Sequence, residues 1–189
     1  MKNKNDFLPS EYKIPGGDSN YLKLSSEGEY RFRIMSSPVL GYEYWTQEGD
    51  KRTPHRIRMD ESVETSVCDP KDLKHFWAMI IWNYEIEKAQ ILHITQKSIQ
   101  KPLRALAKDE DWGSPVGEDG YDIVITRTGL TLNDTEYSVT PKPQKKLKEG
   151  IEQFVKDLKI NLEALFTNDD PFKGDAISEK DMEEIEKEL

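Results

Sequence analysis

The sequence predicts a mainly β domain with one internal helix, followed by an amphipathic helix and an acidic C-terminal tail. Short runs rich in β-branched and aromatic residues fill most of residues 21–141, which is typical of strands. One helical pattern interrupts these runs at residues 96–108. The length of 189 residues suits one well-packed domain with additional arms.

The first half of the chain predicts an extended arm and three strand-forming runs. Residues 1–20 contain scattered proline and glycine, which is typical of an arm without regular structure. The three runs are residues 29–35, 39–46 and 54–59. In the first run apolar side chains alternate with Arg31 and Arg33, so both arginines are expected on one outer face.

A central strand, its hairpin partner and a helix come next. Residues 75–82 are apolar on both faces, as in a strand buried within a sheet, and residues 88–94 follow after a short turn. Thr95 suits the N-cap of a helix over residues 96–108, in which Pro102 is expected to introduce a kink or shift the start. A last hairpin consists of residues 121–127 and 135–140.

Three segments extend beyond this domain: a basic linker at 142–149, an amphipathic helix at 150–166 and an acidic tail at 167–189. The apolar stripe of the helix needs a partner. Packing back on the domain is the default expectation, and a second copy of the chain or a replication protein is the alternative. The net charge of the chain is −9, and the tail holds nine acids against three lysines, so −6 lies in the tail and −3 elsewhere. Such asymmetry is typical of an interaction tail.

The order of elements points to one architecture. If the first two runs merge into one long bent strand, the order is strand, strand, strand, helix, strand, strand. This is the order of the OB fold, a five-stranded Greek-key barrel with a helix between strands 3 and 4, whose strand face and loops bind oligonucleotides. We therefore predict an OB-type barrel over residues 21–141. A small β-sandwich with a C-terminal helix is the alternative.

Several short motifs, in this order and spacing, resemble the single-stranded DNA-binding proteins of tailed bacteriophages. They are GYEYW at 41–45, HFWA at 75–78, IWN at 81–83, ILHITQKSIQ at 91–100, DWG at 111–113, YDI at 121–123, TR at 126–127 and TEYS at 135–138. The resemblance covers roughly residues 7–147. It implies an OB barrel that coats exposed single strands, without sequence preference, during phage DNA replication or recombination.

Two features depart from the pattern of such proteins. The tail ends in Glu188 and Leu189, whereas the tails of cellular relatives and of some phage relatives end in an aromatic residue. Some phage proteins of this kind hold a structural zinc, but Cys68 is the single cysteine here and only three histidines accompany it. We therefore expect neither a metal ion nor a cofactor.

Strand binding without sequence preference requires cations for the phosphates and flat rings for the bases. The predicted cationic residues are Arg31, Arg33, Arg56, Arg58, Lys97, Lys101 and Arg127. The pair at 56 and 58 extends the stripe of the first pair if their strands are neighbours. A solvated strand face is the competing interpretation of the first pair, and a solvated helix face that of the helical cations, which include Arg104.

The predicted stacking residues are Tyr42, Tyr44, Trp45, Trp77, Trp82 and Trp112. Alternation places the two tyrosines on one face of their strand and Trp45 on the other. The tryptophans at 77 and 82 are five residues apart and so point to opposite faces, and at most one of them faces the core. Packing in the core is the competing interpretation for each ring, and for Trp112 it is capping of the open end of the barrel.

An enzyme is not expected. Cys68 precedes Asp69, whose charge disfavours the thiolate, and no glycine-rich phosphate loop precedes a helix. The chain has no apolar run long enough to cross a membrane and no secretory signal, and a single cysteine suits a reducing compartment. We expect a cytoplasmic protein, in the host cell if a phage encodes it.

The tail has two physical interpretations. It occupies the basic groove until DNA displaces it, or it recruits replication or recombination proteins. Its predicted partner-binding residues are Asp181, Glu183, Glu184, Glu186, Glu188 and Leu189. Two other functions remain open: a protein–protein adaptor whose acidic tail mimics DNA, and a structural module without a nucleic-acid role.

Overall fold

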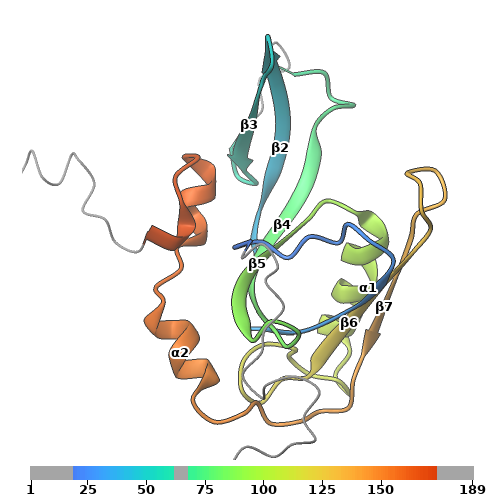
Figure 1. The fold of residues 1–189 in the computed structure, drawn as a ribbon, viewed down its shortest axis with the longest axis vertical. Helices are drawn as coiled ribbons and strands as arrows, with labels where there is room; N and C mark the ends of the chain where they lie inside the picture. The colour runs from blue at the N-terminus through green and yellow to red at the C-terminus, as the bar shows by residue number, and fades with distance from the viewer. Residues whose placement is uncertain (1–18, 62–67, 174–189) are drawn as a thin grey trace, which may run out of the picture.

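The computed structural model describes residues 19–61 and 68–173. Its elements, in chain order, are β1 (Gly28–Ile34), β2 (Val39–Glu48), β3 (Lys51–Arg58), β4 (Lys74–Asn83), β5 (Lys88–Ile94), α1 (Lys97–Lys108), β6 (Asp122–Thr128), β7 (Glu136–Pro141), α2 (Ile151–Asp157) and the short 3₁₀ helices η1 (Leu162–Phe166) and η2 (Pro171–Lys173). Figure 1 shows that the β2–β3 hairpin extends beyond the rest of the body, which gathers around α1, β4, β5 and β6. None of the described helices has the length and apolarity that a membrane span requires.

All seven strands belong to one antiparallel sheet, in the order β3-β2-β4-β1-β6-β7, with β5 on the other side of β4. β1 and β2 pair with successive parts of β4, Arg33 opposite Trp82 and Leu40 opposite Trp77. The mainly β prediction is therefore confirmed, but the strand count is seven and the described strands form an open sheet. The extra strands arise because residues 35–38 separate β1 from β2, and because the basic run folds back on β2 as β3.

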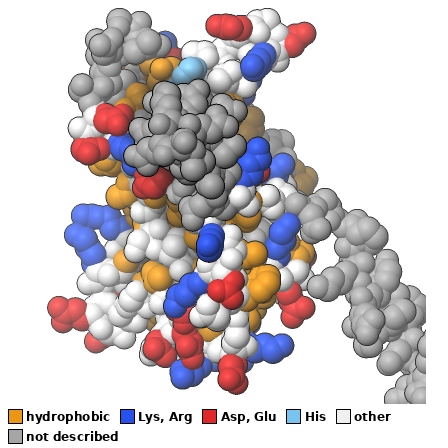
Figure 2. Space-filling view, turned by 90° about the vertical axis from the view of Figure 1, so that its left-hand side faces the viewer, with side chains coloured by type: hydrophobic (Ala, Val, Ile, Leu, Met, Phe, Trp, Pro, Cys, Tyr) orange, Lys and Arg blue, Asp and Glu red, His pale blue; other side chains and the backbone are white. Residues whose placement is uncertain are grey.

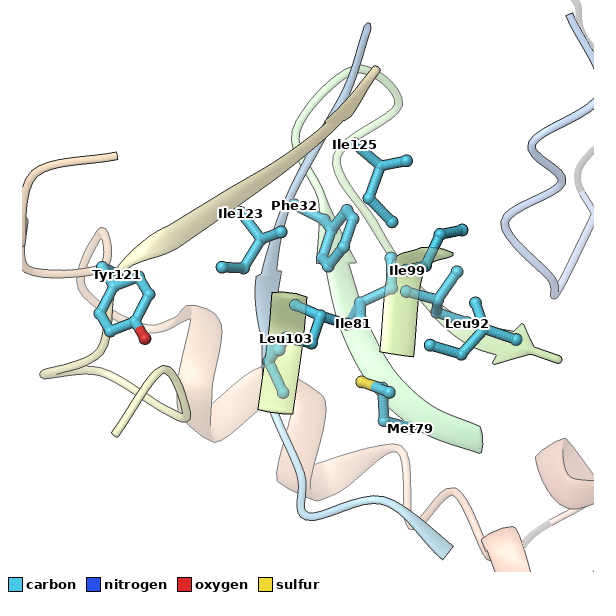
Figure 3. Close-up of a cluster of buried hydrophobic side chains, with 11 residues drawn as sticks. Phe32, Met79, Ile81, Leu92, Ile99, Leu103, Tyr121, Ile123 and Ile125 are labelled. Atoms are coloured by element: carbon cyan, nitrogen blue, oxygen red, sulfur yellow. The ribbon is translucent and has the colours of Figure 1, made fainter. Parts of the chain in front are cut away.

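The main core lies between the sheet and α1. Phe32, Met79, Ile81, Leu92 and Ile123 come from four strands and are almost fully buried, and Ile99 and Leu103 of α1 close the cluster, as Figure 3 shows. Burying each such side chain contributes about 1.5–3 kcal/mol of transfer free energy. The helix forms as predicted, except that its N-cap is Gln96 rather than Thr95, and it continues through Pro102.

A C-terminal segment, residues 147–173, covers the other face of the sheet. Val155 of α2 packs against Trp82 and Ala89, while η1 packs against β4 and β5 through Leu162 and Leu165. The expectation that this segment packs back on the domain is therefore confirmed. Figure 2 looks onto this side of the molecule, and where the face is not covered by grey residues it shows acidic and basic side chains interspersed.

The prediction of one helix over residues 150–166 is wrong. α2 ends at Asp157, and Lys159 adopts a left-handed backbone with φ of 47°, so the chain turns before it resumes as η1. The first residues of the predicted tail also belong to the packed segment: Pro171 is buried, and its carbonyl accepts a 2.9 Å hydrogen bond from the backbone N–H of Asn161.

Gly41 of β2 allows η1 to approach the sheet closely. A Cβ at this position would lie 2.5 Å from the carbonyl oxygen of Ile57 and 2.9 Å from Cε1 of Phe166. Because real Cβ atoms do not approach so closely, any larger residue would displace β3 or η1. The first residue of the GYEYW motif is therefore a glycine that close packing requires.

Candidate nucleic-acid interface

The two arginines of β1 contact the same carboxylate but differ in their exposure to solvent. Arg31 is half exposed, and its Nε donates to Oδ2 of Asp122 over 2.9 Å. Arg33 has a relative exposure of 0% and its Nε donates to Oδ1 of the same carboxylate over 2.8 Å. Its other nitrogens donate to the backbone carbonyls of Gly117, Glu118 and Lys145. The prediction that Arg33 is exposed on an outer face is therefore wrong, because the chain around residues 117, 118 and 145 covers its side chain.

Asp122 is the centre of this buried charge cluster. Burial by itself would raise the pKa of its carboxyl, but hydrogen bonds from Arg31 and Tyr84 and the charge of Arg33 lower it below the ordinary value. Burial and the hydrogen bond to Asp122 raise the pKa of Tyr84 to about 12. The cluster ties β1 and β6 to the chain that leads into the C-terminal segment, and we interpret it as structural.

The arginines of β3 do not continue a stripe from β1. Two strands, β2 and β4, lie between β3 and β1, so the condition for one continuous stripe is not met. Arg58 pairs with Glu163 of η1 and stands over the Phe166 ring, 4.5 Å from its centroid. Arg56 lies 3.4 Å from Glu43 and also donates to the carbonyl oxygen of Leu165. The C-terminal segment thus occupies both arginines.

The Glu43 carboxylate forms a second buried charge cluster that sequence patterns did not indicate. Its Oε2 lies 3.4 Å from Nε of Arg56 and 3.1 Å from Nε2 of His93. Burial would raise the pKa of Glu43, but His93 and Arg56 lower it below its ordinary value. The register that brings β2, β3 and β5 together creates this cluster, so no local motif could have indicated it.

An exposed cationic stripe runs along α1. Lys97, Lys101, Arg104 and Lys108 are all exposed, and their spacing places them on one helical face. The helix contains no acidic residue, and none of the four cations pairs with a carboxylate among the described residues. This α1 stripe therefore presents four charges that are free to meet phosphates.

One face of the β2–β3–β4 region carries a row of partly exposed rings. This ring row consists of Tyr42, Tyr44, His55, His75 and Trp77. Directly opposed residues in the register share a face, so Tyr42 meets His75 at 5.4 Å between centroids and Tyr44 stacks on His55 at 4.8 Å. Both tyrosines and Trp77 were predicted from sequence, whereas the histidines were missed because their strand pairing was unknown.

Hydrogen bonds fix the row in place and join it to α1. Nε1 of Trp77 donates to Nε2 of His75 over 2.9 Å, and Nδ1 of His75 then donates to the carbonyl oxygen of Gly41 at 2.8 Å. Nε2 of Gln100 in α1 donates to the backbone carbonyl of His75 over 3.2 Å. The ring row and the N-terminal end of the α1 stripe are therefore neighbours.

Trp45 lies on the opposite face of β2, as predicted. It is 45% exposed, and the guanidinium of Arg52 stands 5.1 Å from its ring centroid. This pair presents a flat surface with a positive charge. It lies on the same face of the sheet as the C-terminal segment, which covers β4 and β5 there. We treat it as a second exposed platform, separate from the ring row.

The remaining predicted site residues lie apart from the ring row. Trp82 is 7% exposed beneath α2, so the prediction that it stacks on bases is wrong. Trp112 packs on Tyr121 with centroids 5.3 Å apart and caps the core. Arg127 donates to Oγ1 of Thr135 near the far end of β6. The predicted partner-binding residues of the tail, positions 181–189, lie outside the described residues, as does the loop at 62–67.

Acid should reduce stability through Asp122 and Glu43. Both carboxyls have a folded pKa below the ordinary value, so the unfolded state binds more protons as the pH falls. Their contribution is complete above the unfolded pKa of about 4 and is lost as the pH falls through the folded pKa. We expect a flat urea midpoint from pH 7 to about 5 and a decline below about pH 4. Asp122→Asn should make that decline shallower, and a midpoint that rises on acidification would contradict this account.

No metal-binding group of three or more histidine, cysteine or acidic residues occurs among the described residues. No protein-family description and no curated protein sequence matches the chain.

Proposed function

We propose that the protein binds single-stranded DNA without sequence preference, across the ring row and the α1 stripe. The observation that supports this most directly is their adjacency: five partly exposed rings border four exposed cations that pair with no described carboxylate. Stacking on aromatic rings contributes about 1–3 kcal/mol per base and tolerates any sequence. Four phosphate contacts would give a salt dependence with a slope of about −3.

We further propose that the fold is of the OB type with an added hairpin. On this view β1 and β2 together correspond to the first strand, β4 and β5 to the second and third, and β6 and β7 to the last two. The pairing of β1 with both β4 and β6, and the place of α1 after β5, support this assignment. The resemblance to phage strand-binding proteins suggests protection of exposed strands during replication or recombination, with the acidic tail recruiting partners or occluding the site.

A titration with poly-dT at two salt concentrations tests the function. We expect tryptophan fluorescence to fall on binding, because Trp77 lies in the ring row, and the affinity to fall at the higher salt concentration. No fluorescence change and no retention of labelled strand would contradict the proposal and favour the acidic adaptor.

Two neighbouring substitutions test which face binds the strand. Tyr44 and Trp45 follow each other in β2 but point to opposite faces. Tyr44→Ala should weaken binding by about tenfold, within the 1–3 kcal/mol range for one stacked base. Trp45→Ala should weaken it less, and each variant is compared with wild type by anisotropy of labelled dT oligonucleotides. The reverse order would place the strand on the face of Trp45 and Arg52.

A further inference from the structure

A cavity of about 380 Å³ opens between β1, β4, β6, the end of α1 and the loop at residues 109–116. Its volume lies within the roughly 300–1,000 Å³ of sites for small ligands. Its walls are mostly apolar, with Trp77, Met79, Leu103 and Val116 among them. Because Trp77 also belongs to the ring row, the cavity adjoins the proposed path of the strand.

Tyr121 places one polar atom in this apolar lining. Its relative exposure is 0%, yet its buried hydroxyl has no hydrogen-bond partner among the described residues. Figure 3 shows the hydroxyl directed to the side on which Leu103 lies, and both residues line the cavity. Buried hydroxyls nearly always have a partner, so this one is available to a polar group that enters the cavity. Burial and the nearby Asp109 raise the pKa of Tyr121, so the hydroxyl stays neutral and can donate or accept.

The charges at the rim restrict the kind of ligand. Lys108 lies there beside Asp109 and Glu110, so a phosphate drawn into the cavity, rather than along the α1 stripe, would meet two carboxylates for one ammonium group. A neutral, flat heterocycle fits better, because one face can lie on apolar walls and its polar edge can reach a hydroxyl. We propose that the cavity receives one unstacked nucleobase of a bound single strand, with Trp77 along its face and the Tyr121 hydroxyl at its edge. This inference rests on the proposed function.

Filling the cavity is the first test. Ala105 and Ala107 of α1 are both exposed, but only Ala107 lines the cavity. Ala107→Trp should weaken the binding of a dT oligonucleotide by about tenfold, within the 1–3 kcal/mol range for one base, while Ala105→Trp should weaken it much less. An oligonucleotide of the same length without bases should bind both variants and the wild type equally.

Removing the hydroxyl is the second test, and it applies even if Ala107→Trp does not fold. Tyr121→Phe should weaken dT binding by about two- to tenfold, the effect of one neutral hydrogen bond. Because no described partner loses a bond, its melting temperature should stay equal or rise. Tyr30→Phe is the control, since the Tyr30 hydroxyl donates to the carbonyl oxygen of Ser26 and neither residue lines the cavity.

The outcomes separate the two proposals. If the wild-type chain binds no oligonucleotide, the proposed function fails and this inference fails with it. If the wild type binds dT but Ala107→Trp binds as tightly as Ala105→Trp, or Tyr121→Phe binds like Tyr30→Phe, the base pocket is wrong and the interface stands. A loss for base-free and base-bearing strands alike would also overturn the pocket, because it would indicate a phosphate contact.

Discussion

Replacing Asp122 with alanine should destabilise the protein by about 3–5 kcal/mol, the usual result of removing one partner from a buried charge pair. The substitution leaves the Arg33 guanidinium at 0% exposure without its counter-charge. It also removes the acceptor for Arg31 and for the hydroxyl of Tyr84. For a domain of this size, the melting temperature should fall by about 6–20 °C.

Two variants calibrate this result in urea and thermal unfolding. Asp122→Asn keeps an acceptor oxygen and should destabilise less than Asp122→Ala. Asp50→Ala, in the exposed turn between β2 and β3, should change stability by no more than about 0.5 kcal/mol. A loss below about 1 kcal/mol for Asp122→Ala would show that the cluster does not hold the fold together.

Replacing Lys97, Lys101 and Arg104 together with alanine should weaken single-strand binding by roughly a hundredfold at 50 mM salt, since each phosphate contact contributes about 0.7 to the salt slope. The slope itself should become shallower by about 2 for three contacts. Alanine is a better helix former than lysine or arginine, so α1 should remain folded. Anisotropy of labelled dT strands across a salt series measures both quantities.

The control removes the same charge elsewhere. Lys145, Lys148 and Lys159 are exposed on or near the C-terminal segment, and their replacement by alanine changes the net charge equally. If binding depends on the α1 stripe, this control should change affinity and slope far less. Equal losses in the two triple variants would show that the overall charge, rather than the stripe, attracts the strand.

Local patterns predicted those parts of the fold that depend on local sequence. Alternation in β1 and β2 and the helical spacing of α1 were predicted nearly to the residue, because side-chain periodicity sets them directly. The same alternation led to the error at Arg33. Alternation correctly assigned Arg33 to the same strand face as Arg31. That face is exposed only where no other segment covers it, and the chain around residues 117, 118 and 145 covers Arg33.

The ring row depended on pairings distant in sequence. His75 meets Tyr42 across 33 positions, and His55 meets Tyr44 only because the basic run folds back as β3. Register of this kind is set by the whole sheet, so a single sequence indicates the tyrosines but not their partners. The break after α2 was likewise unpredictable from the apolar stripe, which continues through the turn at Lys159.

Because Trp82 lies beneath α2, DNA binding cannot quench the whole tryptophan fluorescence of the protein. A strand bound at the ring row would quench Trp77, yet an indole enclosed between the sheet and Val155 keeps its emission whatever occupies the other face. Saturation should therefore leave a residual emission whose Trp82 component is blue-shifted and out of reach of iodide, while exposed Trp45 remains open to it. A plateau well above zero is thus expected at full occupancy.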